Sequence, residues 1–160
     1  MKKNRLPSPS VVFGHQVNEM ITSPQVIAPS GEFTASIVTG NLGPVLDPAR
    51  ISDSWLSVGA SGKDDDDDLS LTGSVYINGV AALSTEPAIA HVSGEASQQK
   101  TTRVTGDTGI THAVVDTDNN TANPGDVITY DLTLVRTASP TTEMSSVSLV
   151  VELEPLNKYR

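Results

Sequence analysis

The chain of 160 residues contains no cysteine, which excludes disulfide bonds and thiol chemistry. Aromatic residues make up only 4% of it, so a hydrophobic core has to be built from valine, isoleucine, leucine and alanine. No apolar stretch approaches the roughly 18 residues of a membrane-spanning helix. No apolar segment follows Lys2, Lys3 and Arg5 to complete a secretory signal. We therefore expect a protein that is made in a cytoplasm and does not enter a membrane.

Positive charge is also scarce. Lysine and arginine together number 10 against 19 aspartate and glutamate residues, which gives a formal net charge of −9. Nucleic-acid binding needs cationic groups that displace counterions from phosphates, so we expect no nucleic-acid partner. The content of 37% hydrophobic and 18% charged residues is compatible with a globular domain and is unlike that of a disordered chain.

The first 30 residues differ from the rest of the chain. They contain four prolines, and because proline lacks a backbone donor, this segment can form neither a long helix nor a central strand. Its apolar side chains nevertheless favour burial. We expect residues 1–30 to be an extended arm that docks on a partner through Leu6, Val11, Val12, Phe13, Val17, Met20, Ile21, Val26 and Ile27.

The remainder reads as short β-strands. In Asp126–Thr137 and in Ser145–Glu154, apolar and polar residues alternate with the period of two that is typical of half-buried strands. The short connector at 138–142 predicts that these two strands form an antiparallel pair. Asn78-Gly79 is a strong signal for a two-residue hairpin turn.

Further strands are predicted on both sides of that turn. In Leu69–Ile77 the apolar residues share one face, and Gly73 is expected to mark a bulge or bend. We find no apolar stripe with a helical period. The sequence therefore predicts an all-β, antiparallel β-sandwich or jelly roll at 31–155, with the extended N-terminal arm before it and a short tail at 156–160. The other predicted strands are Glu32–Val38, Ser54–Val58, Thr101–Val104 and Thr111–Asp116.

Two acidic stretches are weak candidates for cation binding. Calcium loops space their acidic residues so that several oxygens converge, and a run of consecutive aspartates has no such spacing. We expect that run to be a solvated loop, with a metal site as the alternative; its members are Asp64, Asp65, Asp66, Asp67 and Asp68. Asp116–Asn120 begins like a calcium-binding loop, but Thr121 replaces the required glycine, so a turn is predicted there.

Nothing in the sequence indicates catalysis or a cofactor. His15, His91 and His112 are far apart, and neither a Gly-x-Ser-x-Gly elbow nor a compact metal-ligand spacing is present. We expect a protein that is not an enzyme. Glycan binding is a competing hypothesis, because sandwiches bind sugars through exposed flat aromatics. The aromatics available for this are Trp55, Tyr76, Tyr130, Tyr159, Phe13 and Phe33.

Three stretches within residues 50–155 carry a resemblance to a known family. They are Val75-Tyr76-Ile77-Asn78-Gly79, Ser84-Thr85-Glu86-Pro87-Ala88-Ile89, and the ending from Gly125 through Tyr130 and Thr137–Met144 to the last strand. In these stretches the chain resembles the β-sandwich or jelly-roll cement and decoration proteins of tailed-bacteriophage capsids.

The resemblance implies a virion structural protein on the outer surface of a phage head. Such a protein would bind the major capsid protein, bridge neighbouring capsomers and self-associate, as a trimer. It would be made in the host cytoplasm and act on the capsid exterior. The alternative is a receptor- or glycan-binding module of a phage fibre or tail.

Overall fold

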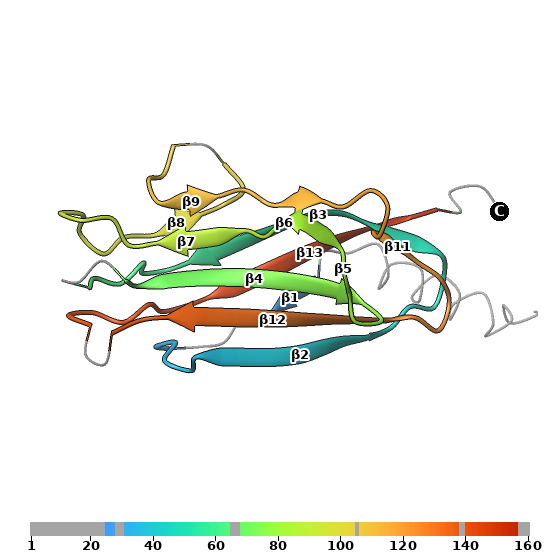
Figure 1. Ribbon diagram of the computed structural model, residues 1–160, viewed down its shortest axis with the longest axis horizontal. Coiled ribbons are helices and arrows are strands. Elements are labelled where there is room, and N and C mark those ends of the chain that lie inside the picture. Colours follow the sequence, from blue (N-terminus) through green and yellow to red (C-terminus); the bar gives the residue numbers. More distant parts are fainter. Residues whose placement is uncertain (1–24, 28–30, 65–67, 105, 138–139, 157–160) are drawn as a thin grey trace, which may run out of the picture.

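The computed structural model describes residues 25–27, 31–64, 68–104, 106–137 and 140–156. The described residues form thirteen strands and no α-helix, and hence no helix able to span a membrane. Two antiparallel sheets pack face to face in an elongated sandwich (Figure 1). The predicted all-β sandwich is confirmed.

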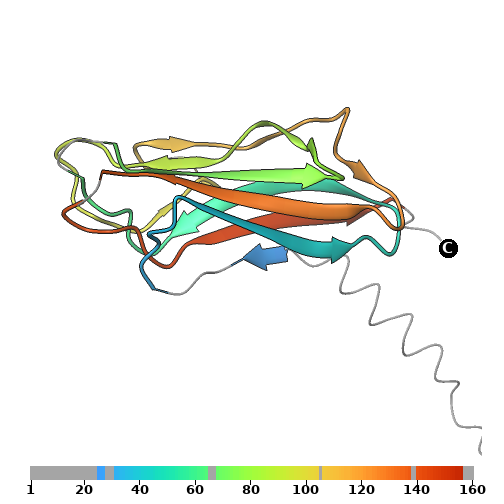
Figure 2. The ribbon, with the colours of Figure 1, turned by 60° about the horizontal axis from the view of Figure 1, so that its bottom comes forward.

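The first sheet contains five strands. Their order is β1 (Gln25–Ile27), β13 (Ser148–Pro155), β3 (Ala49–Val58) and β11 (Thr121–Ala122), and β8 (Lys100–Thr101) also pairs with β3. Figure 2 shows the sandwich from another side, with the short blue β1 lying against β13.

The second sheet contains six strands. Their order is β2 (Ile37–Pro44), β12 (Val127–Val135), β4 (Ser70–Ile77), β7 (Ala88–Ala90) and β9 (Ile110–Thr111), and β5 (Val80–Ala81) also pairs with β4. A separate small ladder joins β10 (Val114–Val115) to β6 (Leu83–Thr85).

Eight of these strands are wound as a jelly roll, in which the first strand pairs with the last and the pairing proceeds inward. The four pairs are β1 with β13, β2 with β12, β3 with β8 and β4 with β7. This winding places consecutive strands of the second half in opposite sheets. The predicted antiparallel pairing of Asp126–Thr137 with Ser145–Glu154 is therefore wrong: β12 pairs with β2 and β4, whereas β13 pairs with β1 and β3.

The core lies between the two sheets. The inner face of the first sheet contributes Leu56 and Leu149, and both reach Gly73 on the inner face of the second sheet. A Cβ atom at Gly73 would lie 3.0 Å from Leu149 Cδ1 and 3.3 Å from Leu56 Cδ2. The register of β4 against β12 passes Gly73 without a shift, so the predicted bulge is wrong. The glycine instead gives room for the close approach of the two sheets.

Several local predictions are confirmed. Leu69, Leu71, Val75 and Ile77 are buried on one face, and Asn78-Gly79 forms the two-residue turn between β4 and β5. Other strand boundaries differ from the predictions. The strand expected at Glu32–Val38 begins only at Ile37, and those expected at Thr101–Val104 and Thr111–Asp116 shrink to β8, β9 and β10.

Candidate functional site

The arm predicted at residues 1–30 contributes the first strand of the jelly roll. In β1, Val26 pairs with Val150 and Ile27 with Leu149. Because Gln25 pairs with Val151, β1 runs antiparallel to β13 and its first residue lies on the side toward Pro155. The other predicted docking residues lie outside the described residues: Leu6, Val11, Val12, Phe13, Val17, Met20 and Ile21.

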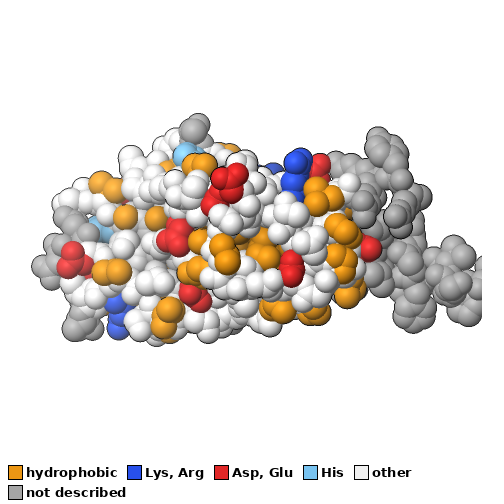
Figure 3. All heavy atoms as spheres, turned by 45° about the vertical axis from the view of Figure 1, so that its right-hand side comes forward, with side chains coloured by type: hydrophobic (Ala, Val, Ile, Leu, Met, Phe, Trp, Pro, Cys, Tyr) orange, Lys and Arg blue, Asp and Glu red, His pale blue; other side chains and the backbone are white. Residues whose placement is uncertain are grey.

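Exposed apolar side chains gather at the end of the sandwich to which β13 runs. Leu46, Val80 and Leu156 are 55%, 52% and 44% exposed. Backbone hydrogen bonds join the turns that carry them, among them Leu156 N–H to Pro48 O at 2.9 Å. Figure 3, which turns this end toward the viewer, shows hydrophobic side chains there. We call Leu46, Val80 and Leu156 the apolar end.

A hydrogen-bonded pair stiffens the same end. Asn78 donates from Nδ2 to Asp126 Oδ1 at 2.7 Å, and its Oδ1 accepts from the Val127 N–H at 2.9 Å. Asp126 also accepts from the Asn123 N–H at 2.7 Å. The bonds from Asn123 and Asn78 favour the charged carboxylate and so lower the pKa of Asp126. The β4–β5 hairpin and the turn before β12 are thereby held together.

The aspartate run is only partly described. Asp64 is 2% exposed, and its carboxylate accepts from Thr137 Oγ1 at 3.0 Å and from the Thr137 N–H at 3.2 Å. The expectation of a solvated loop is therefore wrong for Asp64. Its hydrogen bonds hold Thr137, which lies just after the end of β12. Asp68 is exposed, whereas Asp65, Asp66 and Asp67 lie outside the described residues. Within the described part of the chain, no group of three or more His, Asp or Glu side chains could hold a metal ion.

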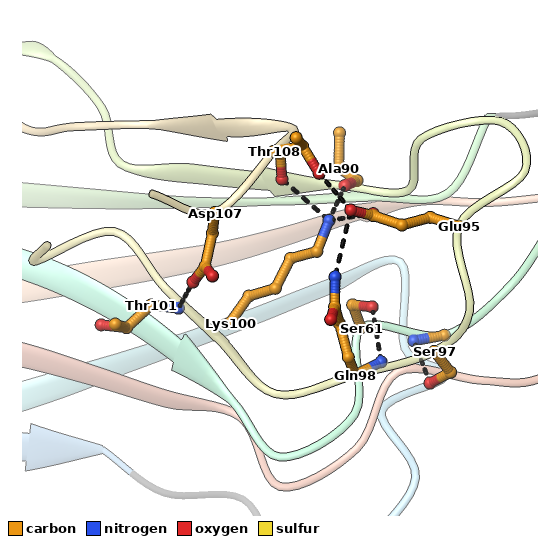
Figure 4. A network of polar contacts seen from close by, with 10 residues as sticks. Ser61, Ala90, Glu95, Ser97, Gln98, Lys100, Thr101, Asp107 and Thr108 are labelled. Carbon is orange, nitrogen blue, oxygen red and sulfur yellow. Dashed lines mark hydrogen bonds and ion pairs between the residues drawn. The ribbon is translucent and has the colours of Figure 1, made fainter. Parts of the chain in front are cut away.

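A buried lysine organises the opposite end of the sandwich (Figure 4). The Lys100 side chain is 0% exposed and donates from Nζ to Glu95 Oε2 at 2.5 Å and to the Thr108 carbonyl at 2.8 Å. Glu95 in turn accepts from Thr108 Oγ1 and from Gln98 Nε2. The bonds from Lys100 and Thr108 are the main reasons that the pKa of Glu95 is lowered. Sequence reasoning missed this pair, because Lys100 lies in a polar stretch with no sign of burial.

The histidines do not converge. His91 is buried, with its backbone N–H bonded to the Leu69 carbonyl, whereas His112 is exposed and its Nδ1 lies 2.5 Å from the Thr102 carbonyl. His15 lies outside the described residues. The predicted turn at Asp116–Asn120 is confirmed: Asp116 accepts from the Asn119 side chain and the Asp118 N–H, which lowers its pKa.

The described aromatic side chains are buried or half-buried. Trp55 is 8% exposed, and the guanidinium of Arg103 lies 4.1 Å from the centre of its ring. This arrangement is a cation–π contact. Phe33 is buried, and Tyr76 and Tyr130 are half-buried. The described residues thus present no pair of exposed rings for a sugar; Phe13 and Tyr159 lie outside them.

Comparison with known proteins identifies no family for this chain. Neither the protein families nor the curated proteins searched contain a match. Three chains of solved structures match, one of them in the structure of infectious bursal disease virus Gx strain. That match has 16% identity and a TM-score of 0.38, and it covers 86% of this chain and 33% of the viral one. The present chain therefore spans about a third of its length. A similarity at this level says nothing of a shared function.

Proposed function

We propose that this protein is a non-enzymatic virion structural protein, a cement or decoration protein on the outer surface of a tailed-bacteriophage head. Its partner would be the major capsid protein, and it would stabilise contacts between neighbouring capsomers. The proposal rests on the resemblance in residues 50–155 and on one structural observation. β1, the described part of the arm, begins at Gln25, and this residue is on the side of the strand toward the apolar end.

Because β1 begins on that side, the arm and the apolar end can bind the same partner. Leu46, Val80 and Leu156 expose apolar surface at one end of the sandwich, and the arm brings further apolar side chains. Burial of each such side chain contributes roughly 1.5–3 kcal/mol before the cost of ordering the arm. Repetition of the contact around a symmetric lattice strengthens binding through multivalency.

Binding restricted to the assembled shell would also explain a cementing action. A ligand that binds the assembled lattice and not its separate parts shifts the equilibrium toward the assembled state. The net charge of −9 directs such a protein toward other proteins and away from nucleic acid. The trimer implied by the resemblance stays a prediction, as do the capsid exterior as its location and synthesis in the host cytoplasm.

Co-sedimentation with phage heads that lack the protein tests the proposal. We expect saturable binding at a fixed ratio to the capsid subunits. Deletion of residues 1–22, which leaves β1 in place, should abolish binding while the circular dichroism of the β-domain is retained. Absence of binding by the full chain would contradict the proposal and direct attention to glycan arrays and to the fibre or tail alternative.

Substitutions separate the apolar end from the arm. Leu46→Asp should weaken binding to heads, because it places a charge in the proposed contact. Val114→Asp is the matched control, since Val114 is exposed to a similar extent, 52%, but lies in β10 outside the apolar end. Equal binding by both variants would remove the apolar end from the proposed site.

A further inference from the structure

One edge of the sandwich differs from the others. Within the described part of the chain, β1, β11 and β9 end their sheets with only two or three residues each, whereas β2 ends the second sheet with eight. Proteins commonly protect sheet edges by keeping edge strands short or by placing charges and proline on them. Figure 1 shows β2 along the outer side of the second sheet. The other edge strands, β5 and β8 included, are thus protected by their shortness, and β2 is not.

The alternation of hydrogen bonds along β2 shows which of its backbone N–H and C=O groups face away from β12. The Leu134 N–H donates to the Ser36 carbonyl, and Val38 and Gly40 continue this series opposite Leu132 and Tyr130. In an antiparallel ladder, alternate residues bond to a given neighbour. The N–H and C=O groups of Ile37 and Thr39 consequently point away from β12, toward the open side.

The residues of β2 do little to discourage pairing with another strand. Ile37–Pro44 carries no charged side chain in a protein whose net charge is −9. A register shift opposite Ile128 and Thr129, together with Pro44, makes only the second half of β2 less able to pair with another strand. Ile37, in its first half, and Val135, at the end of the neighbouring β12, expose 54% and 55% of their surfaces. The Ile37–Asn41 stretch is therefore an uncharged edge flanked by exposed apolar side chains.

We propose that two copies of this chain associate through β2, antiparallel and about a two-fold axis at Thr39, to form one continuous sheet. In this arrangement Thr39 lies opposite Thr39 of the second copy, and Ile37 lies opposite Asn41 of that copy. Threonine–threonine pairs are favourable across strands, and no like charges meet. A two-fold contact requires such a self-complementary strand. We favour a second copy over another partner for the following reason. Copies of a protein with a net charge of −9 repel one another, and β2 is a long edge without charge at which they can approach.

Single cysteines test the register, because the chain has none of its own. Two Thr39 Cα atoms in the proposed pair would be about 5.5 Å apart, within the range of a disulfide. Two Ile37 Cα atoms would be separated by four residue steps, or at least about 13 Å. Under oxidation, Thr39→Cys should form a covalent dimer and Ile37→Cys should not. Equal cross-linking of the two variants, or none by Thr39→Cys, would overturn the proposal.

Light scattering after gel filtration tests association directly. The full chain should give twice the mass of one 16.8 kDa chain, and Thr39→Lys should halve that value while the circular dichroism is retained. Thr111→Lys, on the short β9 edge, is the control and should leave the mass unchanged. The two-fold dimer is an alternative to the trimer that the resemblance implies, so a wild-type monomer or trimer would overturn it. Co-sedimentation of Thr39→Lys with heads reports on capsid binding separately, so the two proposals fail independently.

Discussion

The ring of Tyr130 lies directly over Gly40 of the neighbouring strand. The two residues are paired in register between β12 and β2, and a Cβ atom at Gly40 would lie 2.2 Å from Tyr130 Cζ. Gly40 has no positive φ, so the backbone itself would accept another residue. The need for glycine here comes from the aromatic ring, which covers the site that a side chain would occupy.

We therefore expect Gly40→Ala to destabilise the domain by about 1–3 kcal/mol, the usual cost of overpacking. Urea denaturation followed by circular dichroism would measure this. The combination with Tyr130→Leu should be less unstable than the sum of the two single variants, because the smaller side chain removes the clash. Strict additivity would show that the ring is not the cause.

The ion pair between the buried Lys100 and the half-buried Glu95 gives a second prediction. Glu95→Ala leaves the Lys100 ammonium buried without its carboxylate and should cost roughly 2–4 kcal/mol. Lys100→Met removes the buried charge and keeps the volume, so its effect should be clearly smaller. Thermal and urea unfolding of both variants would check the order. A larger loss in Lys100→Met would mean that the ion pair itself stabilises the fold.

Stability should fall in acid. The pKa values of Glu95, Asp116 and Asp126 are lowered in the folded protein, so the unfolded chain takes up protons first as the pH falls. The stability contributed by these groups is present above their ordinary values of 4.5 and 3.8 and is lost as the pH drops below them. Melting temperatures measured from about pH 6 to about pH 2 should show this decline.

Asp126→Asn provides the matched test of that explanation. It should make the decline shallower, because one of the carboxylates with a lowered pKa is gone. An identical slope in the wild type and Asp126→Asn would exclude Asp126 as a source of the acid sensitivity.

The two ends of the aspartate run should respond differently to substitution. Asp64→Ala leaves Thr137 without its buried acceptor and should cost about 1–3 kcal/mol. Asp68→Ala, at an exposed residue, should change the free energy of unfolding by less than about 0.5 kcal/mol. A chelator should leave the wild-type melting temperature unchanged. A drop of several degrees would instead reveal a bound cation.

The sequence by itself determined the strands that became β4, β12 and β13 and where one tight turn falls. The alternation in Val127–Val135 places Ile128, Leu132 and Leu134 on the buried face, and Asn78-Gly79 forms the expected turn. These features depend on side-chain period and on local backbone preferences, which residues near in sequence supply. The same local rules predicted the buried face of β4.

Only the tertiary structure decided which strands pair. β12 and β13 follow one another in sequence but lie in different sheets, because the jelly roll pairs the first strand with the last. The roles of Gly73 and of Asp64 likewise depend on residues distant in sequence, Leu56 and Leu149 for one and Thr137 for the other. Such contacts gain their free energy from burial and close packing between remote segments, which no local pattern encodes.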